Sequence, residues 1–161
     1  MFNVLPGHSK VFIFQADKVL SDVDLNLISN ELNVFIPGWA AHGSDLRADF
    51  KIFEKIFIVV GLDESQAAAS GCSKDALTRC IKDIGSKINV DFFNRLNSVY
   101  VDTENNLKIV DMMTLKSLIQ KDEVRINTKV YNNLIENKGQ LDNDWLVDIK
   151  DSWHKTLVPI L

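Results

Sequence analysis

Residues 46–60 have the sequence LRADFKIFEKIFIVV, which predicts a β-hairpin. Apolar side chains at the even positions from 46 to 52 alternate with charged ones, the period-two pattern of a strand with one solvated face. Residues 56–60 form a second, wholly apolar run, and residues 53–55 between the runs suit a turn. Because a connection this short joins antiparallel neighbours, we expect an antiparallel sheet.

The residues before this hairpin predict a strand followed by a helix. The β-branched and aromatic run at 11–14 is typical of a buried strand. Ser21 precedes Asp24 by three residues, the spacing of a capping box, and apolar side chains then recur at helical spacing as far as the Pro37-Gly38 pair. We therefore predict a helix over residues 22–35.

The residues after the hairpin predict further elements of both kinds. Ser73 is expected to open a second helix, on which Asp75, Arg79, Asp83 and Lys87 step along one side at intervals of four. We interpret this charged row as a solvated face of paired ions. The remaining predictions are a hairpin of strands 99–101 and 107–110, a helix over 114–121, a strand over 124–130, and a segment at 141–161 that wraps the body.

The predicted order is β-α-β-β-α-β-β-α-β, which indicates an α+β fold. We expect a mainly antiparallel sheet covered by two to three helices. The sequence contains no internal repeat, no low-complexity tract and no long polar linker, so we predict a single α+β domain over residues 1–161.

Composition limits the partners of this chain. The 161 residues carry a net charge of −4, so no overall positive field would attract a nucleic acid. The longest unbroken apolar run has five residues, whereas a membrane-spanning helix needs about 20. The two cysteines, Cys72 and Cys80, have the spacing of neither a redox pair nor a zinc knuckle. We expect a soluble protein of the reducing cytoplasm.

Motifs for nucleotides, metals and cofactors are missing from the sequence. Neither GxxxxGK[ST] nor GxGxxG occurs, so no phosphate-cradling loop is expected. His8, His42 and His154 are far apart and do not form a ligand pair. Asp142 and Asp144 resemble the start of a calcium loop, but Val147 occupies the position where such a loop requires glycine. We predict no metal and no cofactor.

The segment Ser70-Gly71-Cys72-Ser73 is the one local arrangement with reactive potential. A thiol just before a helix lies where unsatisfied N–H groups favour its anion, so Cys72 is a candidate nucleophile, with His42 or His154 as its base. The alternative is that Gly71 permits a tight entry into the helix while Cys72 is a buried packing residue. We favour the buried thiol.

Aromatic and histidine side chains gather in two further places. Trp39 and His42 follow the first predicted helix, and Trp153 and His154 lie near the end of the chain. Trp and Tyr are enriched where an apolar body meets a polar edge, which describes a ligand pocket and also an ordinary lid over a core. We treat these four residues, with Gly71 and Cys72, as candidate binding residues.

Four segments together resemble a family of bacterial proteins of similar size and unknown function. They are Trp39-Ala40-Ala41-His42-Gly43, Ala69-Ser70-Gly71-Cys72-Ser73, Tyr131-Asn132-Asn133-Leu134 with Lys138-Gly139, and Ser152-Trp153-His154. Members of this family often carry the label "ABC transporter ATPase", so the resemblance implies nucleotide binding. The sequence has no nucleotide motif that would support that label, and the resemblance supplies no catalytic residue.

The leading hypothesis for function is a small cytoplasmic module that binds an unidentified small molecule or protein. Two alternatives remain. The first is a thiol-dependent enzyme that uses Cys72, and the second is the nucleotide-binding protein that the family label implies.

Overall fold

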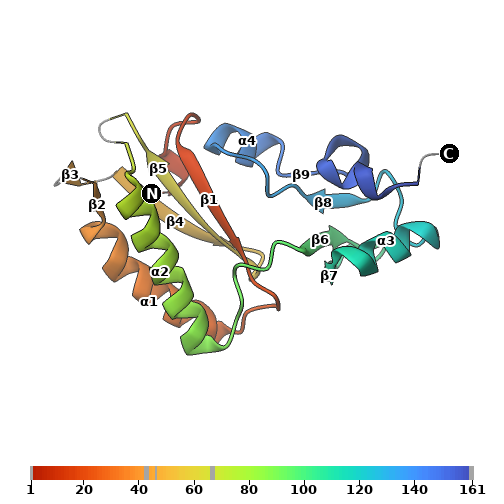
Figure 1. Cartoon of the computed structure of the whole chain (residues 1–161), viewed down its shortest axis with the longest axis horizontal. Coiled ribbons are helices and arrows are strands. Elements are labelled where there is room, and N and C mark those ends of the chain that lie inside the picture. The colour runs from red at the N-terminus through yellow and green to blue at the C-terminus, as the bar shows by residue number, and fades with distance from the viewer. Residues whose placement is uncertain (1, 42–43, 46, 66–67, 160–161) are drawn as a thin grey trace. The chain divides into compact units, whose positions relative to one another are not determined.

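A computed structural model describes residues 2–41, 44–45, 47–65 and 68–159. The chain divides into two compact units, each discontinuous in sequence (Figure 1). Unit 1 comprises Met1–Phe93 and Glu136–Leu141, and unit 2 comprises Asn94–Ile135 and Asp142–Leu161. Two compact units can share one domain, so the single domain over 1–161 stays a prediction.

Unit 1 is built on a three-stranded antiparallel sheet of order β1-β5-β4. The strands are β1 (Lys10–Gln15), β4 (Arg47–Phe53) and β5 (Phe57–Asp63), and every residue of the central β5 is buried. Glu54 and Lys55 adopt the left-handed conformation between β4 and β5, with φ of 54° and 53°. The antiparallel hairpin predicted over 46–60 is thus confirmed.

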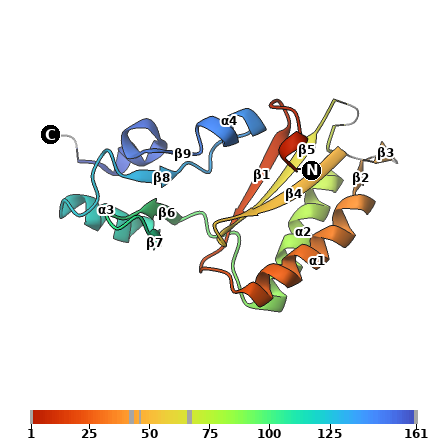
Figure 2. The same ribbon diagram turned by 180° about the vertical axis from the view of Figure 1, so that it is seen from behind.

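Two long helices cover one face of this sheet (Figures 1 and 2). They are α1 (Asp22–Gly38) and α2 (Gly71–Ile88). The predicted capping box is confirmed, because the Ser21 hydroxyl accepts the Asp24 N–H at 3.2 Å and the Asp24 carboxylate accepts the Ser21 N–H at 2.9 Å. One apolar core joins the helices to the sheet; its fully buried members include Ile28, Leu32, Ile58, Val60, Leu62, Leu77, Ile81 and Ile84.

The start of α2 differs from the prediction. Ser70, not Ser73, is the N-cap residue, and its hydroxyl accepts the Ser73 N–H at 3.1 Å. An N-cap side chain receives its hydrogen bond from a residue two or three positions further on, so the capping serine precedes the first turn. Cys72 accordingly lies in the first turn of α2 rather than just before the helix.

The segment Glu136–Leu141 completes unit 1 along the outer edge of β1. The Val11 N–H donates to the Glu136 carbonyl at 3.0 Å, and Lys10 pairs with Asn137 in an isolated bridge. Two further backbone bonds tie this segment to the turn before β1, from Lys138 to Ser9 and from Gly139 to Gly7, each at 2.8 Å. A two-residue ladder of β2 (Ala40–Ala41) and β3 (Ser44–Asp45) follows α1.

Unit 2 contains a four-stranded antiparallel sheet of order β7-β6-β8-β9. Its strands are β6 (Asn97–Val101), β7 (Leu107–Asp111), β8 (Lys129–Tyr131) and β9 (Leu146–Asp148). Helix α3 (Met112–Gln120) is capped by Asp111, and short 3₁₀ turns Ile149–Asp151 and Trp153–Leu157 follow β9. Helix α4 (Lys138–Asn143) comes between β8 and β9 in the sequence, and its residues up to Leu141 belong to unit 1. One core cluster of this unit contains the buried side chains Leu115, Val124, Val130 and Ile149.

The predicted hairpin of unit 2 is confirmed, whereas the strand predicted over 124–130 is present only at its end. Only Lys129–Tyr131 is extended, because the preceding residues form a turn in which the Thr128 hydroxyl accepts the Arg125 N–H at 2.9 Å. The alternation of apolar and polar residues from 124 onward belongs to this turn, in which Val124 is buried, and not to a strand.

The α+β class and the mainly antiparallel pairing are confirmed, with two sheets in place of one. The predicted order of elements is also present, with the β2-β3 ladder, α4 and β9 added to it. None of the helices in the described parts of the chain is long and apolar enough to cross a membrane.

Candidate functional site

One end of the unit 1 sheet gathers polar side chains from three separate parts of the sequence. The turn before β1, the first residue of β4 and the last residue of β5 lie together there, and α2 begins at the same end (Figure 1). We call this cluster the loop end; it consists of His8, Arg47, Asp63 and Ser65.

Asp63 is the centre of the loop end. Its side chain is only 1% exposed, although it carries a carboxylate. One oxygen, Oδ1, accepts the Ser65 hydroxyl at 2.6 Å and the Ser65 N–H at 3.0 Å. These two hydrogen bonds, with a smaller contribution from His8, hold the pKa of Asp63 below its usual value. The group is therefore an ionised carboxylate that solvent barely reaches.

Two exposed basic side chains are held against this buried carboxylate. His8 Nε2 lies 3.4 Å from Asp63 Oδ1, and Arg47 Nη1 lies 3.4 Å from Asp63 Oδ2. The side chains of His8 and Arg47 are 66% and 55% exposed, so most of their surface faces solvent. Asp63 thus orients an imidazole and a guanidinium whose other nitrogen atoms remain open to a ligand.

The predictions from sequence missed this cluster. Its members are separated by 39 and 16 residues along the chain, and the antiparallel register of β4 and β5 places Arg47 opposite Asp63. The one available signal was a carboxylate directly at the end of a wholly buried strand, where a charge needs a partner.

The structure brings Trp39 together with the first turn of α2. Trp39 is 3% exposed, and its Nε1 donates to the Ser73 carbonyl at 2.9 Å. The indole therefore packs into the core and leaves little surface for a ligand. Gly71 and Cys72 are exposed in the same turn, so the expectation of a buried Cys72 thiol is wrong. Position 72 points away from the apolar stripe that contacts the sheet.

Trp153 and His154 belong to unit 2, where the His154 side chain is buried and hydrogen-bonded within the protein. His154 is 1% exposed, with Nδ1 2.9 Å from the Ser152 hydroxyl and Nε2 3.1 Å from the Ser98 hydroxyl. Burial lowers the pKa of His154 to about 4, and the Trp153 ring stacks on the imidazole at 3.9 Å. His154 is thus a neutral, fully engaged group, which is a poor general base. His42, the other predicted base, lies outside the described residues.

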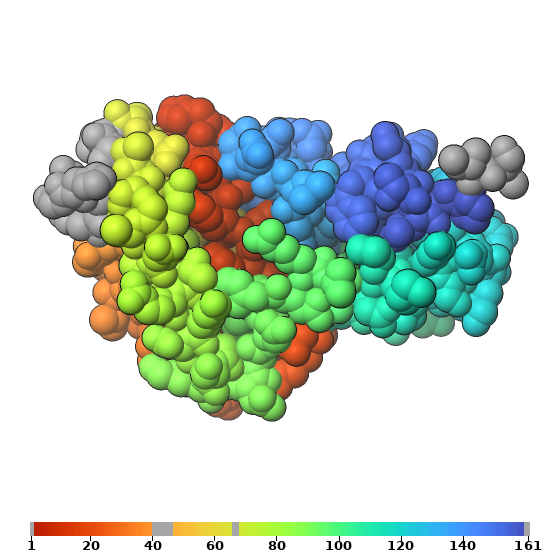
Figure 3. Space-filling model, in the orientation of Figure 1, coloured from red at the N-terminus to blue at the C-terminus, as the bar shows by residue number. Residues whose placement is uncertain are grey.

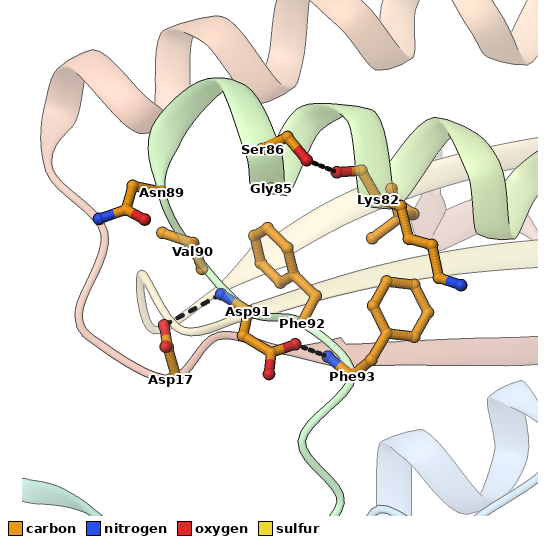
Figure 4. A pocket seen from close by; sticks show the side chains of 10 residues that line it. Asp17, Lys82, Gly85, Ser86, Asn89, Val90, Asp91, Phe92 and Phe93 are labelled. Atoms are coloured by element: carbon orange, nitrogen blue, oxygen red, sulfur yellow. Dashed lines mark hydrogen bonds between the residues drawn. The ribbon is translucent and has the colours of Figure 1, made fainter.

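A pocket of about 470 Å³ opens at the other end of α2 (Figure 4). Phe92 and Phe93 contribute aromatic surface, and Asp17 and Asp91 are its carboxylates. Asp17 accepts the Asp91 N–H at 3.3 Å and Asp91 accepts the Phe93 N–H at 2.8 Å, so both carboxylates hold the turn after α2 in place. Because both carboxylates already accept hydrogen bonds from the backbone, this pocket is a weaker candidate for a ligand site than the loop end.

The described residues contain no group of three His, Cys, Asp or Glu side chains that could hold a metal ion. Comparisons of the chain with family models, curated proteins and solved structures find no match. The family resemblance of the four segments therefore remains a prediction, and any functional argument depends on the geometry of the chain itself.

Proposed function

We propose that this protein is a binding module without catalytic activity, and that its loop end binds an anionic group. The proposal is carried by one observation, the nearly inaccessible Asp63 carboxylate that orients exposed His8 and Arg47 side chains. A cytoplasmic location is part of the proposal, because both cysteines are free thiols.

The chemistry of the two donors supports an anion as the ligand. A guanidinium has five N–H donors in a planar fork, and Asp63 engages only one edge of Arg47. Charge-assisted hydrogen bonds from such a fork to a carboxylate or phosphate are stronger than neutral ones. The N-terminus of α2, at the same end of the sheet, adds the partial positive charge of its unsatisfied N–H groups.

The contacts with Asp63 lower the conformational-entropy cost of binding a ligand. A free arginine side chain loses rotamer freedom when it grips a ligand, which costs about 0.5–1.5 kcal/mol for each such side chain. Because Arg47 and His8 already contact a buried partner, part of that ordering is complete before the ligand arrives. The same contacts discriminate against cationic ligands, which would meet two basic groups.

The proposal is tested by titrating the ¹⁵N-labelled protein with inorganic phosphate, sulfate and citrate in separate experiments. We expect saturable chemical-shift changes at the amides of His8, Arg47 and Ser65. Arg47→Gln should weaken binding roughly tenfold or more, since it removes the fork. Lys51→Gln is the matched control, because Lys51 is an exposed cation on the same strand that points to Asn3.

Two outcomes would refute the anion site. One is a set of shifts that never saturates or that spreads evenly over all surface lysines. The other is an equal loss of affinity in Arg47→Gln and Lys51→Gln. Well-dispersed spectra of both variants would establish that a loss is not caused by unfolding.

The thiol-enzyme alternative draws on the exposure of Cys72 in the first turn of α2. It requires a base beside Cys72, and a Cys72→Ser variant with unchanged ligand binding would favour the module. The nucleotide-binding alternative predicts hydrolysis of ATP with magnesium. We expect no turnover, because the sequence has no glycine-rich loop followed by lysine.

A further inference from the structure

The charged row of α2 forms an open surface on unit 1. Asp75, Arg79, Asp83 and Lys87 are all exposed and recur every four residues, so they lie along one ridge of the helix. Figure 3 shows that no other part of unit 1 covers α2, coloured yellow-green to green, on the face turned to the viewer. The signs of the four charges alternate from minus at Asp75 to plus at Lys87.

This row is not the set of internal ion pairs that its spacing predicts. Lys87 pairs with Glu31 of α1 at 2.7 Å. Among the residues that the structure describes, Asp75, Arg79 and Asp83 make no ion pair and no side-chain hydrogen bond. Three of the four charged groups are thus available to a partner.

A groove between α1 and α2 runs along the row, and Arg79, Asp83 and Lys87 line it together with apolar side chains. Its volume is about 600 Å³, and its apolar side chains are Val34, Phe35 and Ala76. Val34 is 81% exposed, so a large apolar side chain beside the groove is open to solvent. Cys80 lines the groove as well, and burial raises the pKa of its thiol to about 11, so this thiol is an apolar contact group at neutral pH.

We propose that a second copy of this chain docks on this surface, with the two α2 helices antiparallel across a two-fold axis. In such an isologous contact, residue i meets residue j and residue j meets residue i. When the axis passes midway between Arg79 and Asp83, each Arg79 faces the second Asp83 and each Asp75 faces the second Lys87. All four contacts then join opposite charges.

Other registers are less favourable. A shift by one helical step places Arg79 opposite Arg79 and Asp75 opposite Asp83, so like charges meet. A parallel arrangement in register places every residue opposite itself. A parallel arrangement shifted by one step also joins opposite charges, but it makes only three contacts and does not close. The antiparallel two-fold contact pairs all four charges and closes into a dimer, which is why a second copy fits as the occupant.

The charged row and the groove have different effects in this dimer. Exposed ion pairs contribute little affinity, but they determine register and exclude wrong partners. Burial of Val34 and its apolar neighbours in the groove supplies the attraction. The dimer is independent of the proposed anion site, which involves other residues of unit 1.

Sedimentation velocity over a range of concentrations, up to millimolar, tests this inference. We expect the wild-type protein to be a reversible dimer. Arg79→Glu should weaken the dimer roughly tenfold or more, because it creates two contacts between like charges. Lys82→Glu, the same charge change on an exposed residue of α2 outside the row, should leave the dimer intact.

Two rescue experiments make the test specific. The double variant Arg79→Glu/Asp83→Arg restores four opposite-charge contacts and should dimerise like the wild type. The single variants Arg79→Glu and Asp83→Arg should each be monomeric but should form a mixed dimer when combined, since all four contacts between them are again of opposite sign. Circular dichroism of each variant separates lost association from lost folding.

Three results would overturn the inference. They are a wild-type protein that stays monomeric at millimolar concentration, a dimer that Arg79→Glu leaves unchanged, and single variants that do not associate on mixing. Binding of a different protein to the groove of a monomeric chain would likewise replace the second copy as the occupant.

Discussion

Acidification should destabilise unit 2 through His154 before most carboxylates are protonated. Burial lowers the pKa of this imidazole from 6.5 to about 4, so the folded protein keeps His154 neutral where the unfolded chain protonates it. The unfolded state then binds more protons, and stability falls with decreasing pH. The free energy of unfolding that neutral His154 contributes is fully present above pH 6.5 and is lost as the pH falls toward 4.

The size of the effect follows from these two pKa values. Linkage between a pKa of 6.5 unfolded and about 4 folded gives a loss of about 2 kcal/mol in the free energy of unfolding between pH 7 and pH 5. This is a large fraction of the roughly 5–15 kcal/mol by which domains of this size are stable. Protonation also removes the acceptor nitrogen that faces a seryl hydroxyl.

Urea denaturation at both pH values measures the loss, and His154→Gln is the control because glutamine cannot be protonated. The variant should be less stable at pH 7, while its decrease between pH 7 and pH 5 should be smaller by about 2 kcal/mol. NMR titration of the imidazole gives the folded pKa directly. A ring that titrates near 6.5, or a variant with the wild-type pH dependence, would refute the argument.

Three further predictions concern unit 1. In urea denaturation, Gly85→Ala should destabilise the fold by about 1–3 kcal/mol, because an added Cβ would lie 2.5 Å from the Val90 carbonyl oxygen. Gly71→Ala is the control and should change stability by less than about 0.5 kcal/mol, because a Cβ added there would have no neighbouring atom within 4 Å. Trp39→Phe should cost about 1–3 kcal/mol in the same assay, since the buried indole loses its hydrogen bond to the Ser73 carbonyl and part of its packing. Cys72 should alkylate well before Cys80 at pH 8, as mass spectrometry would detect, because the Cys80 thiol is half-buried with its pKa raised to about 11; equal rates would contradict this.

Local features of the fold could be predicted from sequence. The capping box at Ser21 and Asp24 depends on residues three positions apart, and the β4–β5 hairpin depends on a turn of three residues. In both cases the interacting groups are near neighbours in the chain. The strand predicted over 124–130 shows the limit of the same approach, because a buried valine and a turn-closing threonine reproduce the spacing of a strand.

Non-local features could not be predicted in this way. Asp63 receives its partners from the turn before β1 and from the first residue of β4, and sheet register, which no short pattern encodes, brings them together. Trp39 was a candidate for ligand binding, yet its indole turns inward to a carbonyl of α2. The exposure of Cys72 depends on the residue at which α2 begins. The predicted N-cap of that helix, Ser73, lies three residues after the observed one, Ser70.

The pairing of β1 with Glu136–Leu141 has a consequence for the nascent chain. The first 93 residues leave the ribosome well before residue 136, so both long helices can pack on the sheet while the outer edge of β1 still exposes unpaired N–H and C=O groups. An unprotected edge is a template for pairing with another polypeptide. At about 5–20 residues per second, the interval lasts a few seconds. We therefore expect partly synthesised chains that are held close together to pair at β1 during this interval, and a chaperone that covers the edge to raise the yield of folded protein.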